Sequence, residues 1–169
     1  MKEILDTTIT AAFTGHRRFD YRQKDAIKSR LTAAIIESYE QGYRNFISGF
    51  AQGFDMLAAE CVAELKALYP DMKLFAAIPY TGHSSYLFGY TRQMYNHLLA
   101  HCDKTFNLSD HYFDRCFLAR DEFMVRNSSR LIAFFDGRGR GGTFYTVRYA
   151  RHRNIPIYNI YPQTKMNYG

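Results

Sequence analysis

The chain has 169 residues, of which 47% are apolar and 17% aromatic. This composition excludes an intrinsically disordered protein, a collagen-like repeat and a small disulfide-stapled scaffold, because it supplies enough apolar surface for a sizeable core. Lysine and arginine outnumber aspartate and glutamate by 22 to 16, which gives a formal net charge of +6. The positive charge favours an anionic small ligand or a nucleic acid, and charge alone does not choose between them.

The hydropathy pattern gives no sign of a membrane segment. No run approaches the roughly 18 consecutive apolar residues of a transmembrane helix, and the first residues lack the apolar core of a secretory signal. We therefore expect a cytoplasmic protein without a membrane partner. Cys61, Cys102 and Cys116 are irregularly spaced and include no C-x-x-C pair, which favours reduced, packed thiols over disulfides.

Two clusters of chemically suggestive residues have simpler interpretations. His97 and His101 have the i, i+4 spacing of zinc ligands and precede Cys102, but no glutamate follows the first histidine and no further ligand is evident. We therefore expect no metal site. Arg148 and Arg151, with the basic residues at 152 and 153, are expected to form a solvated helix face.

The first half of the chain alternates short β-rich segments with longer segments of helical periodicity. A strand is expected over residues 8–14, followed by a helix in which Ile27, Leu31 and Ile35 recur on one face and which ends at Gly42. The pattern then repeats: a strand at 45–48, a helix from about 56 up to Tyr69-Pro70, where the proline ends it, a strand at 73–78 closed by a second proline, and a helix through residues 94–99.

The second half continues the same alternation. We expect a short strand near 105–106, a helix over 120–127, a strand at 131–135, a glycine-rich turn that opens a helix at about Thr143, and a last strand at 155–158. This order predicts an α/β protein, a three-layer sandwich with a mostly parallel sheet and helices on both faces. No repeat, linker or composition break divides the chain, so we expect one domain over residues 1–169, with its core at about 8–160.

The loops that follow the predicted strands concentrate glycine and polar residues, at 14–18, 48–55, 79–83 and 136–143. Ligands of open parallel sheets bind beyond the carboxyl ends of the strands, so these loops are the expected site. Glycines beside a helix N-terminus expose backbone N–H groups to an anion, and the Thr143 hydroxyl either caps the helix or donates to a phosphate. Asp55 either accepts hydrogen bonds from a sugar or stabilises the helix dipole. The turn after the first strand does not match the G-x-G-x-x-G fingerprint, and the turn at Gly137 lacks the lysine of a P-loop.

Five groups of residues occur in a characteristic order: FTGHR at 13–17; FISG at 46–49 with GFDMLAAE at 53–60; AAIPY at 76–80; Arg120 with MV at 124–125; and DG at 136–137 with GGT at 141–143 and TVRYA at 146–150. This set, which spans about residues 8–160, closely resembles the YpsA-like family of the SLOG superfamily. That superfamily of Rossmann-like proteins includes the Lonely-guy phosphoribohydrolases and the DNA-processing protein DprA. The resemblance implies a Rossmann-like fold with a pocket for a nucleotide or a nucleotide derivative, and no other cofactor.

The resemblance also implies which residues bind the ligand. Loop residues 48–55 and 141–143 would hold phosphate and ribose, with residues 15–17 closing one side and Arg120 another. The full implied set is Gly15, His16, Arg17, Ser48, Gly49, Gly53, Phe54, Asp55, Pro79, Arg120, Asp136, Gly141, Gly142, Thr143 and Thr146.

One departure from the hydrolase pattern bears on activity. The phosphoribohydrolases carry P-G-G-x-G-T-x-x-E, and alignment on the Gly-Thr pair puts Thr146 where their glutamate stands. A hydroxyl cannot replace a carboxylate that activates water or stabilises oxocarbenium-like charge. We therefore expect a binding module that senses or sequesters a nucleotide-like ligand, rather than an enzyme.

Two alternatives remain. The first is a hydrolase of a nucleotide N-glycosidic bond, in which Asp55 or Glu60 supplies the carboxylate and Arg120 positions the phosphate. The second is DprA-like nucleic-acid binding, which the net charge favours and which predicts affinity that falls steeply with salt. A homo-oligomer is compatible with the sequence.

Overall fold

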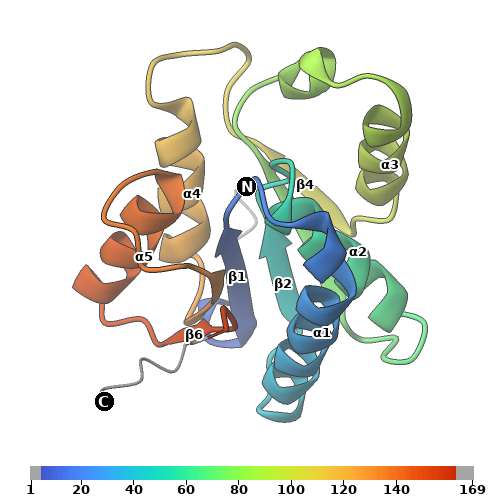
Figure 1. The fold of residues 1–169 in the computed structure, drawn as a ribbon, viewed down its shortest axis with the longest axis vertical. Coiled ribbons are helices and arrows are strands. Elements are labelled where there is room, and N and C mark those ends of the chain that lie inside the picture. Colours follow the sequence, from blue (N-terminus) through green and yellow to red (C-terminus); the bar gives the residue numbers. More distant parts are fainter. Residues whose placement is uncertain (1–4, 163–169) are drawn as a thin grey trace.

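A six-stranded parallel sheet forms the centre of the molecule in the computed structural model, which describes residues 5–162 (Figure 1). The strands are β1 (Thr10–Gly15), β2 (Asn45–Ser48), β3 (Lys73–Ile78), β4 (Lys104–Asn107), β5 (Arg130–Phe134) and β6 (Ile157–Asn159). Their order across the sheet is β4-β3-β2-β1-β5-β6, and every strand pair within the described residues is parallel. The predicted α/β, Rossmann-like architecture is therefore confirmed.

Helices cover both faces of this sheet. One face is covered by α1 (Lys24–Glu40), α2 (Phe54–Leu65) and α3 (Gly89–Ala100), and the other by α4 (Cys116–Arg126) and α5 (Gly142–His152), as Figure 1 shows. Short 3-10 turns at Thr7–Ile9, Tyr21–Gln23 and His83–Tyr86 lie in the connections. The molecule thus has the three predicted layers.

Side-chain alternation along the central strands builds two separate cores. In β1, Ala11 and Phe13 pack with α1 and α2, whereas Ala12 packs with α4 and α5. In β5, Phe134 joins the first core and Leu131 the second. Successive strand residues point to opposite faces, and both faces are covered, which explains why these strands are nearly continuous apolar runs.

The expected end of the first helix is confirmed. Ile27, Leu31 and Ile35 are buried against the sheet, as their spacing predicts. Gly42 has a positive φ of 104°, and its N–H donates to the carbonyl of Tyr39 at 3.0 Å. This left-handed position suits glycine because it carries no Cβ.

The limits of two strands differ from the prediction. The first strand begins at Thr10 rather than residue 8, because the Asp6 carboxylate accepts from the amide of Thr8 at 3.1 Å and stabilises a 3-10 turn. The last strand begins at Ile157 rather than residue 155. The Ile155 N–H donates to the Ala150 carbonyl at 3.0 Å, and the proline that follows has no N–H for a sheet ladder.

Helix α2 ends at Leu65 rather than at Tyr69-Pro70, because the chain turns there, with the Leu68 N–H donating to the Leu65 carbonyl at 3.0 Å. Helix α4 begins earlier than predicted, at Cys116 rather than about residue 120. The preceding residue, Arg115, has a left-handed conformation with φ 66°, and it provides no side-chain cap. The serine, threonine or aspartate that usually marks a helix start is therefore missing at this position. The extra turn adds Phe117 to the helix, one turn before Arg120.

Other expectations concern thiols and membrane segments. Cys61, Cys102 and Cys116 are all free, as predicted. Within residues 5–162, no helix combines the length and the apolar character that crossing a membrane requires.

The strand order creates a crevice at one place in the sheet. From β1 the chain moves outward through β2 and β3 to β4, and it then returns to place β5 on the opposite side of β1. The loop after β1 therefore leads to a helix on one face, and the loop after β5 to a helix on the other. Such a switch point leaves a crevice at the carboxyl ends of the strands, where α/β proteins bind ligands.

Candidate functional site

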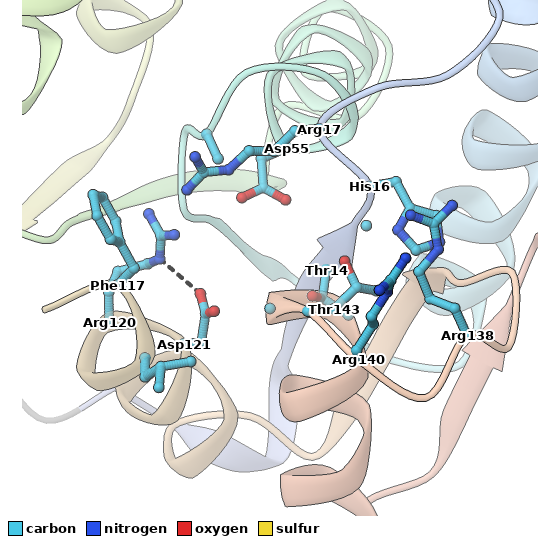
Figure 2. Close-up of a pocket in the computed structure, with 15 residues that line it drawn as sticks. Thr14, His16, Arg17, Asp55, Phe117, Arg120, Asp121, Arg138, Arg140 and Thr143 are labelled. Atoms are coloured by element: carbon cyan, nitrogen blue, oxygen red, sulfur yellow. Dashed lines mark hydrogen bonds and ion pairs between the residues drawn. The ribbon is translucent and has the colours of Figure 1, made fainter. Parts of the chain in front are cut away.

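A cavity of about 370 Å³ lies at this switch point, between the carboxyl end of β1, helix α4 and the start of α5 (Figure 2). Its lining residues are Thr14, Gly15, His16, Arg17, Ala51, Asp55, Phe117, Leu118, Arg120, Asp121, Arg138, Arg140, Gly141, Gly142 and Thr143. Those named from the sequence are Gly15, His16, Arg17, Asp55, Arg120, Gly141, Gly142 and Thr143. The structure therefore brings together residues from four loops and helices far apart in the chain.

Ser48 and Gly49 shape the cavity without lining it. The Ser48 hydroxyl donates to the carbonyl of Asp55 at 2.8 Å and accepts from the amide of Phe50 at 3.2 Å, which ties the loop to the start of α2. The Gly49 carbonyl accepts from Nη1 of Arg120 at 2.6 Å. A Cβ on Gly49 would lie 2.9 Å from Arg120 Nε, so the absence of a side chain lets the guanidinium cross the loop.

Gly53 and Phe54 join the loops after β1 and β2. The Phe54 amide donates to the His16 carbonyl at 3.2 Å, and a Cβ on Gly15 would lie 2.3 Å from the Phe54 ring. Gly53 has φ 84°, and a Cβ there would lie 2.2 Å from the carbonyl oxygen of Arg17. These residues hold the two loops at a spacing that a side chain would prevent.

Glu60 and Pro79 lie outside the cavity lining. Glu60 is on α2, 3.9 Å from Lys28 Nζ across the interface with α1. Pro79 is buried directly after β3. Neither residue is placed to contact a ligand in this cavity, and Asp55 is the one of the two candidate carboxylates that faces it.

Arg120, Asp121 and Thr146 form a linked group at the α4 side of the cavity. Arg120 is 3% exposed, and its Nε donates to Asp121 Oδ1 at 2.7 Å. The Thr146 hydroxyl lies 3.2 Å from Asp121 Oδ2 and 2.8 Å from the Gly142 carbonyl. Thr146 is thus separated from the cavity by Asp121, whose carboxylate lines it.

Asp55 is a buried carboxyl group in the first turn of α2. Its pKa is raised to about 7, mainly by burial; the Arg120 guanidinium opposes this shift and the Asp121 carboxylate adds to it. Figure 2 shows the carboxyl groups of Asp55 and Asp121 directed toward the same open space. Both interpretations of Asp55 from the sequence are compatible with this position, because it lies at a helix start and also faces the cavity.

His16 lines the opposite wall, whereas Asp136, also named from the sequence, contacts His16 and does not line this cavity. The Asp136 amide donates to Nε2 of His16 at 3.0 Å, and burial is the largest of the effects that lower the pKa of His16. Asp136 Oδ1 lies 3.2 Å from the same nitrogen. Because Nε2 of His16 accepts a hydrogen bond from an amide, the imidazole ring is neutral and carries its proton on Nδ1. The contact between His16 and Asp136 is therefore not an ion pair. Hydrogen bonds from Arg138 lower the pKa of Asp136 to about 2.

The start of α5 is open toward the cavity. Its N-cap, Gly141, has φ 97° and contributes no side chain, and a Cβ on Gly141 or Gly142 would meet no atom within 4 Å. Arg17 and Arg140 are exposed, and neither makes a salt bridge within the described part of the chain. Backbone N–H groups at a helix start together with uncompensated guanidinium groups form an environment suited to an anion.

Several lining residues were not named as site residues from the sequence: Thr14, Ala51, Phe117, Leu118, Asp121, Arg138 and Arg140. The two arginines lie in the glycine-rich loop that the sequence did single out, so their charge was the available signal. Phe117 and Leu118 were missed because the start of α4 was placed too late. Asp121 lies within the predicted helix and was missed because its contact with Thr146 forms only in the folded chain.

The alternative metal site receives no support. The His97 and His101 rings lie with centroids 4.5 Å apart, and His101 Nδ1 is 2.8 Å from the His97 carbonyl. Among residues 5–162 there is no group of three histidine, cysteine, aspartate or glutamate side chains arranged to hold a metal ion. Arg148 and Arg151 are exposed on α5, as expected for a solvated helix face.

Comparison with protein families identifies the chain's relatives. The YpsA model, described as the YspA SLOG family, matches residues 11–164. The chain belongs to this family. Its curated relatives include UPF0398 proteins of Bacillus cereus, 26% identical over 160 residues, and of Bacillus thuringiensis, 25% identical over 160 residues. Each alignment covers 89% of this chain and 87% of the relative.

Two solved structures share the fold of this YpsA-family protein. DNA processing protein A from Helicobacter pylori, which binds single-stranded DNA, matches with a TM-score of 0.61 and 20% identity, over 95% of this chain and 68% of that one. TM1055, a structural genomics target, matches with a TM-score of 0.55 and 14% identity, over 88% and 71%. At these identities the likeness shows the fold alone.

The close approach of the Arg17 carbonyl to Gly53 predicts that adding one methyl group at Gly53 lowers the stability of the fold. Gly53→Ala should destabilise the protein by about 1–3 kcal/mol, because a methyl group would overlap the Arg17 carbonyl and the positive φ would be strained. Gly139→Ala is the matched control, since a Cβ there meets nothing within 4 Å. Urea denaturation measures both. Equal stability of the two variants would contradict the loop packing described above.

The raised pKa of Asp55 predicts a specific pH dependence. From about pH 4 to pH 7 this carboxyl is protonated in the folded protein but ionised in the unfolded chain, so its contribution to stability falls as the pH rises. Asp55→Asn removes this proton uptake. The variant's stability relative to the native protein should therefore rise with pH, by up to about 1.4 kcal/mol per unit, and level off above pH 7. Parallel stability curves over this range would refute the assignment.

Proposed function

We propose that this YpsA-family protein binds a nucleotide or a nucleotide-derived ligand in the cavity at the switch point, as a sensor or sequestering module. The observation that carries the proposal is the combination, in one cavity, of an open helix N-terminus with two arginines that have no acidic partner in the described structure. Such a combination suits a phosphate group, which accepts hydrogen bonds from backbone amides and guanidinium groups.

The positions of the arginines give them different parts in this proposal. Arg138 is held by Asp136, with a contact of 2.5 Å between Nη2 and Oδ2, so a ligand would have to compete with that carboxylate. Arg140 and Arg17 have no such contact, and both line the cavity. We therefore assign the main phosphate contact to Arg140 and to the backbone at the start of α5.

The carboxyl groups on the other side of the cavity suit a sugar. Asp121 accepts hydrogen bonds from Arg120 and Thr146 and retains further lone pairs. Asp55, with a pKa of about 7, is both a donor and an acceptor in its protonated form. Ribose hydroxyls also donate and accept, so this pair complements a ribose joined to the bound phosphate.

The test is a titration of the purified protein with ribose 5-phosphate, AMP, ADP, ADP-ribose and NAD. Arg140→Ala should weaken binding of the preferred ligand about tenfold or more, because a hydrogen bond to a charged group is worth about 1.5–3 kcal/mol. Arg151→Ala, an exposed arginine near the other end of α5, is the matched control and should bind like the native protein. Isothermal titration calorimetry measures the affinities.

Two results would overturn the proposal. Equal loss in both variants would mean that the arginines act only through overall charge. Absence of binding to every phosphate compound, with binding to a single-stranded oligonucleotide that weakens steeply with salt, would favour the nucleic-acid alternative.

A second candidate function, hydrolysis of the ligand's N-glycosidic bond, is favoured by one observation. The glutamate of the related hydrolases aligns with Thr146, and the Thr146 hydroxyl contacts the carboxylate of Asp121. Helix α5 has no carboxylate at position 146, but Asp121 on α4 places one beside that position. Asp55, which retains a proton near neutral pH, faces it and is suited to protonate a departing base.

Hydrolysis predicts that incubation with a nucleotide releases free base and ribose phosphate. Asp121→Asn should abolish this release and retain ligand binding, since the amide preserves the shape but cannot act as a base. Chromatography of the incubated ligand measures the products. Intact nucleotide after long incubation with the native protein would leave binding as its function.

A further inference from the structure

A second cavity, of about 280 Å³, lies beside the first, on the α1 side of the sheet. It is enclosed by the first turns of α1, the end of β5 and the chain around Tyr161. His16 and Arg138 line both cavities, so the two spaces are separated by the width of one side chain. The first cavity therefore has a neighbour that the proposed phosphate and ribose contacts do not use.

The walls of the second cavity differ chemically from those of the first. Three aromatic side chains contribute to it: Phe19, Phe134 and Tyr161. The Phe134 ring lies 4.8 Å from that of Tyr161 and 6.1 Å from that of Phe19, measured between centroids. In this aromatic enclosure Phe134 is 4% exposed and stacks on Phe54, so the half-buried Phe19 and Tyr161 supply the apolar surface for a planar ring system.

Polar groups surround this aromatic enclosure. Gln23, at the end of the 3-10 turn before α1, and Arg30, on α1, are exposed and line the cavity. Arg30 Nη1 donates to the Ile160 carbonyl at 3.3 Å, which places its guanidinium beside the aromatic wall. An amide and a guanidinium group supply donors and an acceptor suited to the edge of a heteroaromatic ring.

We propose that this second cavity holds the aromatic base of the nucleotide whose phosphate and ribose occupy the first cavity. The inference rests on the proposed nucleotide-binding function and extends it to the far end of the ligand. A nucleotide has an anionic phosphate and a planar aromatic base. The first cavity has the cationic groups that suit the phosphate, and the second has the aromatic side chains that suit the base.

The sizes of the cavities support a ligand that spans both. Pockets for small ligands usually measure about 300–1,000 Å³. The second cavity falls just below this range and the first near its lower limit, so a ligand that spans both has more room than either provides alone. Arg138 extends along both spaces and, with the His16 ring, forms the boundary across which the sugar would lie.

The ring of His16 is fixed at this boundary. Its Nε2 accepts the Asp136 amide at 3.0 Å, and its ring lies 6.0 Å from that of Phe134 and 6.4 Å from that of Tyr161, edge to face. One face of the boundary is thus continuous with the aromatic wall. A ligand that lies across His16 would therefore contact guanidinium groups in the first cavity and aromatic rings in the second.

The test fills the second cavity and leaves the first unchanged. Ala26 is exposed on α1 and lines only the second of the two cavities, so Ala26→Phe places a ring in it without burying new groups in the core. Ala33→Phe is the matched control: it is exposed on the same helix two turns later and lines neither cavity. Both variants and the native protein are titrated with ribose 5-phosphate and with AMP, GMP and UMP.

The native protein should bind at least one of the three nucleotides about tenfold or more tightly than ribose 5-phosphate, as expected for a base stacked on aromatic side chains. Ala26→Phe should lose this preference and keep the affinity for ribose 5-phosphate, which also shows that it is folded. Ala33→Phe should behave like the native protein.

Three results separate the failure of this inference from the failure of the proposed function. If the native protein binds ribose 5-phosphate and shows no preference for a nucleotide, the base subsite does not exist. If Ala26→Phe retains the full preference, the base binds elsewhere. If neither ribose 5-phosphate nor any nucleotide binds to the native protein, the proposed function fails, and this inference fails with it.

Discussion

The buried guanidinium of Arg120 is the interaction on which the geometry of the cavity depends. A charge at 3% exposure is costly unless it is paired and hydrogen-bonded. Arg120 meets this requirement through the Gly49 carbonyl on one side and the Asp121 carboxylate on the other. The bond to Gly49 connects the loop after β2 to α4 across the carboxyl edge of the sheet, and the bond to Asp121, within α4, holds that carboxylate at the cavity wall. Loss of either partner would leave a buried charge unsatisfied.

The same positive group also lowers the pKa of two neighbours, although burial is the larger effect at both. It lowers the pKa of Asp55 but does not outweigh burial, so this carboxyl keeps its proton at mildly acidic pH. Burial, with Arg120 and Arg17 as further causes, lowers the pKa of His83 to about 4. His83 is therefore neutral, and its ring packs 5.9 Å from that of Phe117, which also lies under the guanidinium of Arg17. An aromatic layer thus supports the cationic side of the cavity.

The sequence was sufficient to predict the layers of the fold, most strands and helices, and the loops that form the cavity. Those features depend on local apolar spacing and on glycine positions, which are visible in a single sequence. The prediction was less accurate for residues whose role depends on contacts with distant parts of the chain. The roles of Gly49 and Gly53 depend on Arg120 and on the Arg17 carbonyl, which approach them only in the folded chain. Asp121 was overlooked because its contact with Thr146 joins α4 to α5.

That contact changes how the missing glutamate is interpreted. Sequence comparison at Thr146 alone indicates the loss of a carboxylate from the site, whereas the folded chain has a carboxylate from the adjacent helix within 3.2 Å of that hydroxyl. Position in the chain and position in space are therefore different criteria for an active-site group. Asp121 is also bound to Arg120, which disperses its charge and restrains its movement. A carboxylate restrained in this way is well suited to hold a ribose hydroxyl, and it would be a weaker base toward water than an unpaired one. The pairing with Arg120 is thus the physical reason for ranking ligand binding above hydrolysis.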